Sequence, residues 1–207
     1  MVSTSAFIKP MSPTLRKEPP DHPAWCHEVK FDGYRIQIHK DGKHVALYSK
    51  NGNDFTNRYP AVATAVAKLP TKAVVLDGEL TLCDDAGNPD FNSLLMKRPG
   101  DLCVWVFDIL SQFGNDLRHL PLVGRHYKLD RFMERVENPF IRQSRTFLDP
   151  HALLRACAQR KLEGIVSKRV DRPYISGPSK DWIKVKCSGW REANTWRHEF
   201  FSRDKHR

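Results

Sequence analysis

The sequence lacks the features of a secreted or membrane-spanning protein. It has no apolar run of the roughly 18 residues that a membrane span needs, and its first twenty residues contain no apolar stretch of signal-peptide length. Its five cysteines are an odd number, are widely spaced and form no C-x-x-C pair, which argues against a disulfide framework and a zinc knuckle. We therefore expect a cytoplasmic protein with no membrane partner.

The common phosphate-binding and metal-binding motifs are also missing. The chain contains neither G-x-x-x-x-G-K-[ST] nor G-x-G-x-x-G, and its nine histidines show no H-x-x-x-H spacing. Any bound nucleotide must therefore be held by side chains on strands, and we assign no metal to the histidines.

Acidic residues are too few to balance the basic ones. The net charge of the 207 residues is +10, and the lysines and arginines are spread along the chain. Such a surplus on a folded surface favours a polyanionic partner, most often nucleic acid, although a merely basic soluble protein remains the alternative. With 40% apolar and 28% charged residues, the chain has the composition of a globular protein of one main domain.

Hydrophobic periodicity predicts strands and helices in irregular order. A hairpin turn is expected at Asp41-Gly42 and a further turn at 84–89. The absence of regular strand–helix alternation favours an α+β fold with mostly antiparallel sheets flanked by helices. Strands are expected at 26–31, 34–40, 44–50, 73–82, 102–110, 164–170 and 182–187, and helices at 60–69, at 122–136 and after the cap Asp149-Pro150.

The chain divides into three parts by composition. Residues 1–24 carry five of the fourteen prolines and little periodicity, so we expect an extended lead-in that packs on the domain surface. The fold proper is expected to begin near Trp25 and to occupy residues 25–190. Residues 191–207 are expected to form a basic C-terminal tail.

Charged residues interrupt several predicted strands. Glu28, Lys30 and Asp32 are spaced two apart and would share one face of an extended strand, as would Lys184 and Lys186. Carboxylates beside lysines suit a polyphosphate with its divalent metal. A lysine whose pKa is lowered by its surroundings can also attack phosphorus as a neutral amine. The alternative for each residue is a solvated strand face.

Five short motifs occur in a specific order. They are K-x-D-G-x-R at 30–35, D-G-E-L at 77–80, V-F-D-I-L at 106–110, E-G-I-V-S-K at 163–168 and W-I-K-V-K at 182–186. This set resembles that of the covalent nucleotidyltransferases, and it is most similar to the adenylation domain of bacterial ATP-dependent DNA ligases of the end-joining type. The resemblance covers residues 6–196 and implies the nucleotidyltransferase (ATP-grasp-like) adenylation fold.

The resemblance implies a role for each motif residue. Lys30 would become linked to AMP, with Asp32 and Gly33 shaping the turn beside it. Arg35 would contact the ribose and Glu28 would face the adenine.

The later motifs would complete the nucleotide site. Glu79 would meet the ribose hydroxyl or the metal, Phe107 would stack on adenine, and Glu163 would be the main carboxylate ligand of Mg²⁺ or Mn²⁺. The phosphates would be gripped by Lys184 and Lys186. The alternatives are that Phe107 is plain core, that Glu163 is a surface acid and that Asp77-Gly78 is only a turn.

One residue outside these motifs carries a nucleic-acid role by the same resemblance. Lys50 stands where the ligases commonly have arginine. It would contact the 5′-phosphate of a nick through its charge, without the two parallel hydrogen bonds that a guanidinium can donate.

The function implied is that of a monomeric ATP-dependent DNA ligase core, associated with the bacterial nucleoid and acting in DNA repair and recombination. It would form lysyl-AMP and seal 5′-phosphate/3′-hydroxyl nicks in nicked or broken duplex DNA. No OB-fold domain is expected in these 207 residues, so a DNA-clamping or other repair protein is a candidate partner in trans. The alternatives are a nick- or end-binding repair accessory with little turnover and an RNA ligase.

Overall fold

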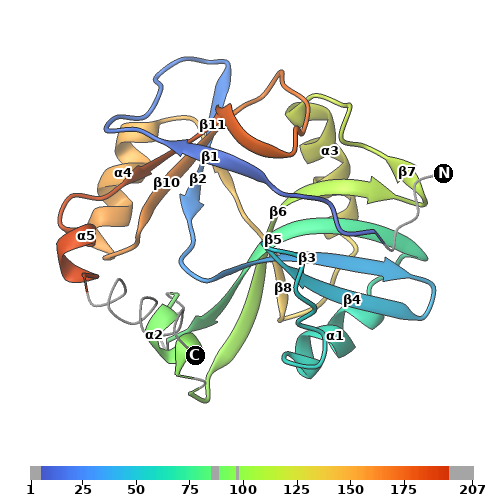
Figure 1. Cartoon of the computed structure of the whole chain (residues 1–207). Coiled ribbons are helices and arrows are strands. Elements are labelled where there is room, and N and C mark those ends of the chain that lie inside the picture. The colour runs from blue at the N-terminus through green and yellow to red at the C-terminus, as the bar shows by residue number, and fades with distance from the viewer. Residues whose placement is uncertain (1–5, 85–88, 97, 196–207) are drawn as a thin grey trace.

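Two β-sheets that face each other form the centre of the molecule (Figure 1). The computed structural model describes residues 6–84, 89–96 and 98–195. The first sheet has the order β1-β11-β10-β2-β9 and the second the order β4-β3-β5-β6-β7, with β8 paired to β6. The strands are β1 Met11–Leu15, β2 Trp25–Lys30, β3 Tyr34–Asp41, β4 His44–Ser49, β5 Ala73–Cys83, β6 Asp101–Gln112, β7 Asn115–Asp116, β8 Ile141–Gln143, β9 Thr146–Phe147, β10 Gly164–Arg169 and β11 Gly177–Lys186.

The expectation of an α+β fold with antiparallel sheets is confirmed. Within the described residues, all strand pairings except β1 with β11 and β6 with β8 are antiparallel. The helices pack on the outer faces: α4 lies against β10 and β2, α3 against β6, and α1 against β4 (Figure 1). The helices are α1 Pro60–Ala67, α2 Phe91–Leu95, α3 Leu122–Met133, α4 Pro150–Gln159 and α5 Trp190–Ala193.

The helix after Asp149 illustrates how local chemistry fixes an element. The Asp149 carboxylate accepts a hydrogen bond from the Ala152 amide at 2.8 Å, and Pro150 occupies the first turn, where no amide donor is needed. Leu153 and Cys157 then point inward, where they pack with Ile165 of β10. The predicted cap and start of this helix are confirmed.

The lead-in differs from its expectation. The fold begins at β1 and not near Trp25, because Met11–Leu15 pairs in parallel with β11 and the Met11 side chain is fully buried. Proline is tolerated there because β1 is an edge strand, and its register shifts between Pro13 and Thr14. Reading the prolines only as strand breakers therefore missed this element.

The structure tests only one of the predictions made for the two turns and the C-terminal tail. The hairpin at Asp41-Gly42 is confirmed, with Gly42 in the left-handed region at φ +58°. Most of the expected turn at 84–89 lies outside the described residues, as does the expected tail beyond residue 195. No helix in the described ranges is long and apolar enough to cross a membrane.

A small apolar cluster joins the two sheets at one end. Met11 and Trp182 from the first sheet pack with Val75 and Leu110 from the second, and Phe107 lies at the margin of this cluster. The sheets are thus held together beside the space in which the charged strand residues meet.

Candidate active site

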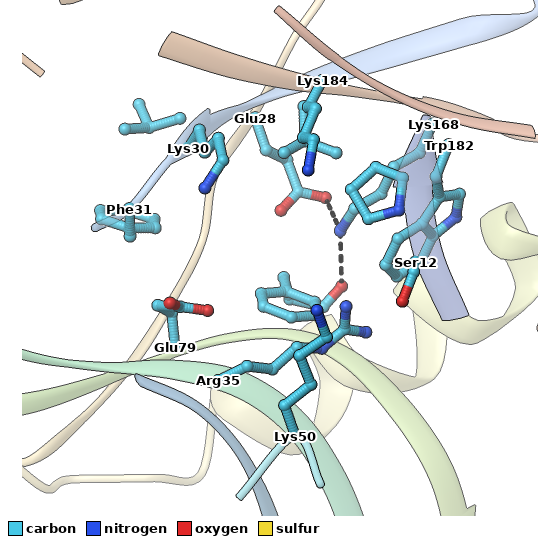
Figure 2. Close-up of a pocket in the computed structure, with 14 residues that line it drawn as sticks. Ser12, Glu28, Lys30, Phe31, Arg35, Lys50, Glu79, Lys168, Trp182 and Lys184 are labelled. Carbon is cyan, nitrogen blue, oxygen red and sulfur yellow. Dashed lines mark hydrogen bonds and ion pairs between the residues drawn. The ribbon is translucent and has the colours of Figure 1, made fainter. Parts of the chain in front are cut away.

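A cavity of about 200 Å³ lies between the two sheets (Figure 2). Seven of the residues that the sequence singled out line it: Glu28, Lys30, Arg35, Lys50, Glu79, Phe107 and Lys184. Figure 2 shows the amino groups of Lys30 and Lys184 pointing into the cavity from the first sheet, opposite Glu79 and Arg35 of the second.

Strand register places the lysines on one face of the first sheet. Gly164 of β10 lies opposite Lys30 of β2 on one side and opposite Lys186 of β11 on the other. Further along β10, Val166 lies between Glu28 and Lys184 in the same way. Residues directly opposite in antiparallel strands share a face, so all four charged side chains converge.

Two motif glycines allow neighbouring strands to approach closely beside the site. A Cβ at Gly164, which has φ +151°, would lie 2.0 Å from the Val185 carbonyl oxygen, and one at Gly33 would lie 2.1 Å from the Leu80 carbonyl oxygen. Both positions therefore require glycine so that neighbouring backbones can approach.

Glu163 is held between two lysines. Its Oε2 accepts from Lys30 Nζ at 2.6 Å and its Oε1 from Lys186 Nζ at 2.9 Å. Burial by itself lowers the pKa of Lys30, but the carboxylates of Glu163 and Glu79 outweigh it and raise that pKa. Burial by itself raises the pKa of Glu163, but the two lysines lower it overall. Lys30 is therefore a protonated ammonium in this arrangement.

Glu79 and Arg35 form the opposite wall. They lie opposite each other in the β3–β5 pairing. Burial raises the pKa of Glu79 to about 7, against the opposing effect of Lys30 and Arg35. Near neutral pH the charge of Glu79 therefore depends on pH.

The guanidinium of Arg35 is fixed from several elements. It donates to both carboxylate oxygens of Asp77, at 3.0 and 2.7 Å, and to the Met11 carbonyl oxygen at 2.7 Å. Tyr174 donates its hydroxyl hydrogen to Asp77 at 2.6 Å. Asp77 lies fully buried in the middle of β5, so the reading of Asp77-Gly78 as only a turn is wrong.

Asp32 does not share the strand face of Glu28 and Lys30. Strand β2 ends at Lys30, and Asp32 lies in the connection to β3, outside the cavity lining. Side chains alternate between the two faces only within a strand, and this alternation ends with β2 at Lys30. Asp32 still acts on Lys30 through its charge, which contributes to raising the pKa of Lys30.

Aromatic rings lie on opposite sides of the cavity. Phe107 and Trp182 meet edge to face with ring centroids 6.0 Å apart, and both line the cavity. Phe107 is half-buried and so is not plain core. Phe31 lines the cavity opposite them and stacks on Trp105 at 4.4 Å.

The sequence reasoning gave no role to Lys168 and Trp182, which also line the cavity. Both lie within the quoted motifs, at the end of E-G-I-V-S-K and the start of W-I-K-V-K. Their motif position was the available signal.

Asp108, which also lies in a quoted motif, is a residue of the protein interior. Both of its carboxylate oxygens pair with Arg125 at 2.8 Å, and both side chains are fully buried.

The carboxylates suit a metal that the substrate helps to hold. No group of three or more His, Cys, Asp or Glu residues that could hold a metal occurs among the residues described. Mg²⁺ commonly uses one or two carboxylates and completes its shell with phosphate oxygens and water. Glu163 and Glu79, which interact through their charges, could supply such a pair.

Comparison with known proteins identifies the class to which this fold and cavity belong. Residues 6–186 match the family described as "ATP dependent DNA ligase domain", so the chain belongs to the ATP-dependent DNA ligase family. Within that family it corresponds to the adenylation domain of the LigD-like bacterial ligases.

Individual relatives support this placement. The chain is 37% identical over 186 residues to the multifunctional non-homologous end joining protein LigD of Pseudomonas aeruginosa, covering 87% of this chain and 22% of that protein. It is 29% identical to the SPbeta prophage-derived DNA ligase-like protein LigB of Bacillus subtilis, covering 86% of this chain and 67% of that protein. The chain spans only about a fifth to a third of the first curated relatives it matches.

Solved structures agree. A mycobacterial DNA ligase D complexed with ATP and MES superposes with a TM-score of 0.72 at 28% identity, covering 86% of this chain and 59% of that one. The ligase domain of Mycobacterium tuberculosis LigD gives a TM-score of 0.75 at 27% identity, covering 86% of this chain and 60% of that one.

Proposed function

We propose that this chain is the nucleotidyltransferase core of an ATP-dependent DNA ligase, with Lys30 as the residue that becomes linked to AMP. The observation that carries the proposal is the position of the Lys30 amino group. It enters a cavity that is also lined by Lys184, Phe107 and Trp182, and it pairs with Glu163, which lies outside the lining. A nucleotide triphosphate matches this lining, because its phosphates suit the lysines and its aromatic base suits the rings.

In the first step Lys30 Nζ attacks the α-phosphorus of ATP. A P–N bond forms, the bond from the α-phosphorus to the bridging oxygen breaks, and pyrophosphate leaves with that electron pair. Lys30 must first leave its ion pair with Glu163 and give up a proton, which solvent can accept because the Lys30 side chain is 21% exposed. Release from Glu163 lowers the barrier to deprotonation, since that carboxylate helps to raise the pKa of Lys30.

The phosphates require positive charge in the transition state. Lys184 and Lys186 lie on the same face as Lys30 and can neutralise phosphate oxygens there. Burial and then the neighbouring Lys30 lower the pKa of Lys184, as expected where cations are gathered closely. A divalent cation held by Glu163, Glu79 and the phosphates would act as a Lewis acid and supply further positive charge.

In the second step the AMP passes from Lys30 to the 5′-phosphate of a DNA strand. The P–N bond breaks, a phosphoanhydride forms, and Lys30 regains its proton. A neighbouring 3′-hydroxyl then displaces AMP and seals the strand. Lys50 is exposed at the cavity margin, where it can contact the incoming 5′-phosphate, and the net charge of +10 favours the duplex in general.

Incubation with ATP labelled at the α-phosphate, followed by denaturing gel electrophoresis, tests the proposal. We expect a labelled adduct on the wild type and none on Lys30→Ala or Lys30→Arg. Lys180→Ala, a change at an exposed lysine of the same sheet, is the matched control and should retain the adduct. An adduct of undiminished yield on Lys30→Ala would refute the assignment.

A further inference from the structure

Lys186 is held at two points outside the cavity lining. Its Nζ lies 2.9 Å from Glu163 Oε1 and 3.9 Å from the centroid of the Trp190 ring. Lys184, two residues earlier on β11, lines the cavity, whereas Lys186 does not. Of these two lysines, Lys186 is therefore the one drawn toward Glu163 and toward helix α5, to which Trp190 belongs.

The chain directly after β11 sets the position of Trp190 (Figure 1). The Cys187 amide donates to the Glu163 carbonyl oxygen at 2.9 Å, and the Trp190 amide donates to the Cys187 carbonyl oxygen at 3.3 Å. Between them Gly189 turns the chain with φ +76°. The half-buried Trp190 ring packs against the apolar cluster between α4 and the first sheet. The ring is thus anchored to the sheet that carries Lys186.

A lysine side chain without such contacts does not keep one position. Its four-carbon stem is flexible and its ammonium is strongly hydrated. A tryptophan ring within about 6 Å attracts an ammonium, and the attraction grows where water is excluded. The Trp190 ring and the Glu163 carboxylate together therefore fix Lys186 Nζ. Since an ammonium has three N–H donors, this arrangement still leaves a donor that a phosphate oxygen can use.

The consequence falls on Glu163, which has one cation on each carboxylate oxygen. Lys30 Nζ lies 2.6 Å from Oε2, and Lys186 Nζ lies 2.9 Å from Oε1. When Lys30 leaves to attack ATP, this carboxylate loses one of the two cations, although its side chain is only 6% exposed. A buried charge without a partner is costly. Lys186 removes this cost only if it stays on Oε1.

We propose that Trp190 is a positioning residue for adenylation: it holds Lys186 on Glu163, so that Glu163 keeps a cationic partner when Lys30 leaves to attack ATP. This inference rests on the proposed function, in which Lys30 is the nucleophile. Because Lys186 lies outside the cavity lining, its position should affect the rate of adenylation more than the affinity for ATP.

The test compares Trp190→Leu, which keeps apolar volume but has no ring, with Trp190→Phe, which keeps a ring. The formation of the labelled adduct is followed over a range of ATP concentrations. We expect Trp190→Leu to lower the rate at saturating ATP about 3- to 10-fold, while the half-saturating ATP concentration stays within about twofold of the wild type. Trp190→Phe should recover most of the rate.

Trp25→Leu is the matched control. Trp25 is also half-buried against the cluster between α4 and the first sheet, and Arg169 Cζ lies 6.0 Å from the centroid of its ring. This variant should keep the wild-type rate.

Competitive labelling of amines without nucleotide gives a second readout that does not depend on adenylation. Labelling of Lys186, quantified by peptide mass spectrometry, should rise in Trp190→Leu because the ring no longer covers the ammonium. It should rise little in Trp190→Phe and not at all in Trp25→Leu. Should Trp190→Leu fail to fold, Trp190→Met, with a flexible apolar side chain, replaces it with the same expectations.

The outcomes separate this inference from the proposed function. Equal losses of rate in Trp190→Leu and Trp190→Phe would mean that Trp190 only fills space, and they would overturn the inference. Unchanged labelling of Lys186 in Trp190→Leu would overturn it as well. A normal adduct on the wild type, with Trp190→Leu behaving like Trp25→Leu, would overturn this inference alone. Absence of an adduct on the wild type would refute the proposed function and this inference together.

Discussion

Glu163→Gln should make the Lys30 amine more reactive toward simple reagents but should slow the transfer of AMP to Lys30. The change keeps the size of the side chain but removes the negative charge that lies 2.6 Å from Lys30 Nζ and 2.9 Å from Lys186 Nζ. Free Lys30 should become a better nucleophile toward a simple reagent, because the carboxylate that holds its proton is gone. Transfer of AMP should become slower, because the phosphates and any divalent cation lose a ligand.

The magnitude follows from the contact that is lost. A charge-assisted hydrogen bond in a partly buried site is worth about 1.5–3 kcal/mol, so the fraction of neutral Lys30 amine at a fixed pH should rise about 10- to 100-fold. The Glu163 side chain is 6% exposed and that of Lys30 21%, so solvent screening places the effect toward the lower end.

The assay is competitive labelling of amines at about pH 8 without nucleotide, with Lys30 quantified by peptide mass spectrometry, alongside adduct formation from ATP. Glu134→Gln, which breaks the exposed ion pair of Glu134 with Arg131, is the control and should alter neither property. If Lys30 labelling does not increase in Glu163→Gln, Glu163 does not hold the Lys30 proton and the reasoning fails.

Three further predictions concern other parts of the molecule. Because burial raises the pKa of Glu79 to about 7, Glu79 loses its charge below that pH. The rate of adenylation at saturating ATP should therefore rise between about pH 6 and 8. Glu79→Gln should flatten that rise in the same pH–rate measurement. Binding to nicked duplex should weaken steeply with salt. In fluorescence anisotropy, Lys50→Ala should reduce the affinity for a 5′-phosphorylated nick more than the affinity for a 5′-hydroxyl nick. Equal losses of affinity for both nicks would contradict a contact between Lys50 and the 5′-phosphate. Arg125→Met leaves Asp108 buried without its partner and should lower the free energy of unfolding by about 3–5 kcal/mol in denaturant titration, whereas Arg118→Met, at a partly exposed pair, should cost about 1 kcal/mol or less.

Local sequence patterns were sufficient for most elements and for the chemical centre of the site. Alternating apolar residues predicted β3 and β4, and the Asp149 cap predicted α4, because these features depend on neighbours within a few residues. The order of the motifs likewise singled out Lys30, Glu163 and Lys184. Their chemistry is carried by residue type and spacing, which the sequence contains in full.

Burial and register required the tertiary structure. Strand β1 was missed because an edge strand that contains proline is stabilised by β11, which lies more than 160 residues further along the chain. Asp32 was placed wrongly because the end of β2 is set by how β2 turns toward β3.

The sequence by itself determined that the motif lysine Lys30, carboxylates and further basic residues occur in the order typical of this ligase family. Only the tertiary structure decided that Lys168 pairs with Glu28, since the contact depends on the register of β2 against β10. It also decided that burial raises the pKa of Glu79 to about 7, because desolvation depends on what surrounds a group in space. Residue identity sets the available chemistry, and packing between distant segments sets the charge state and partner of each group.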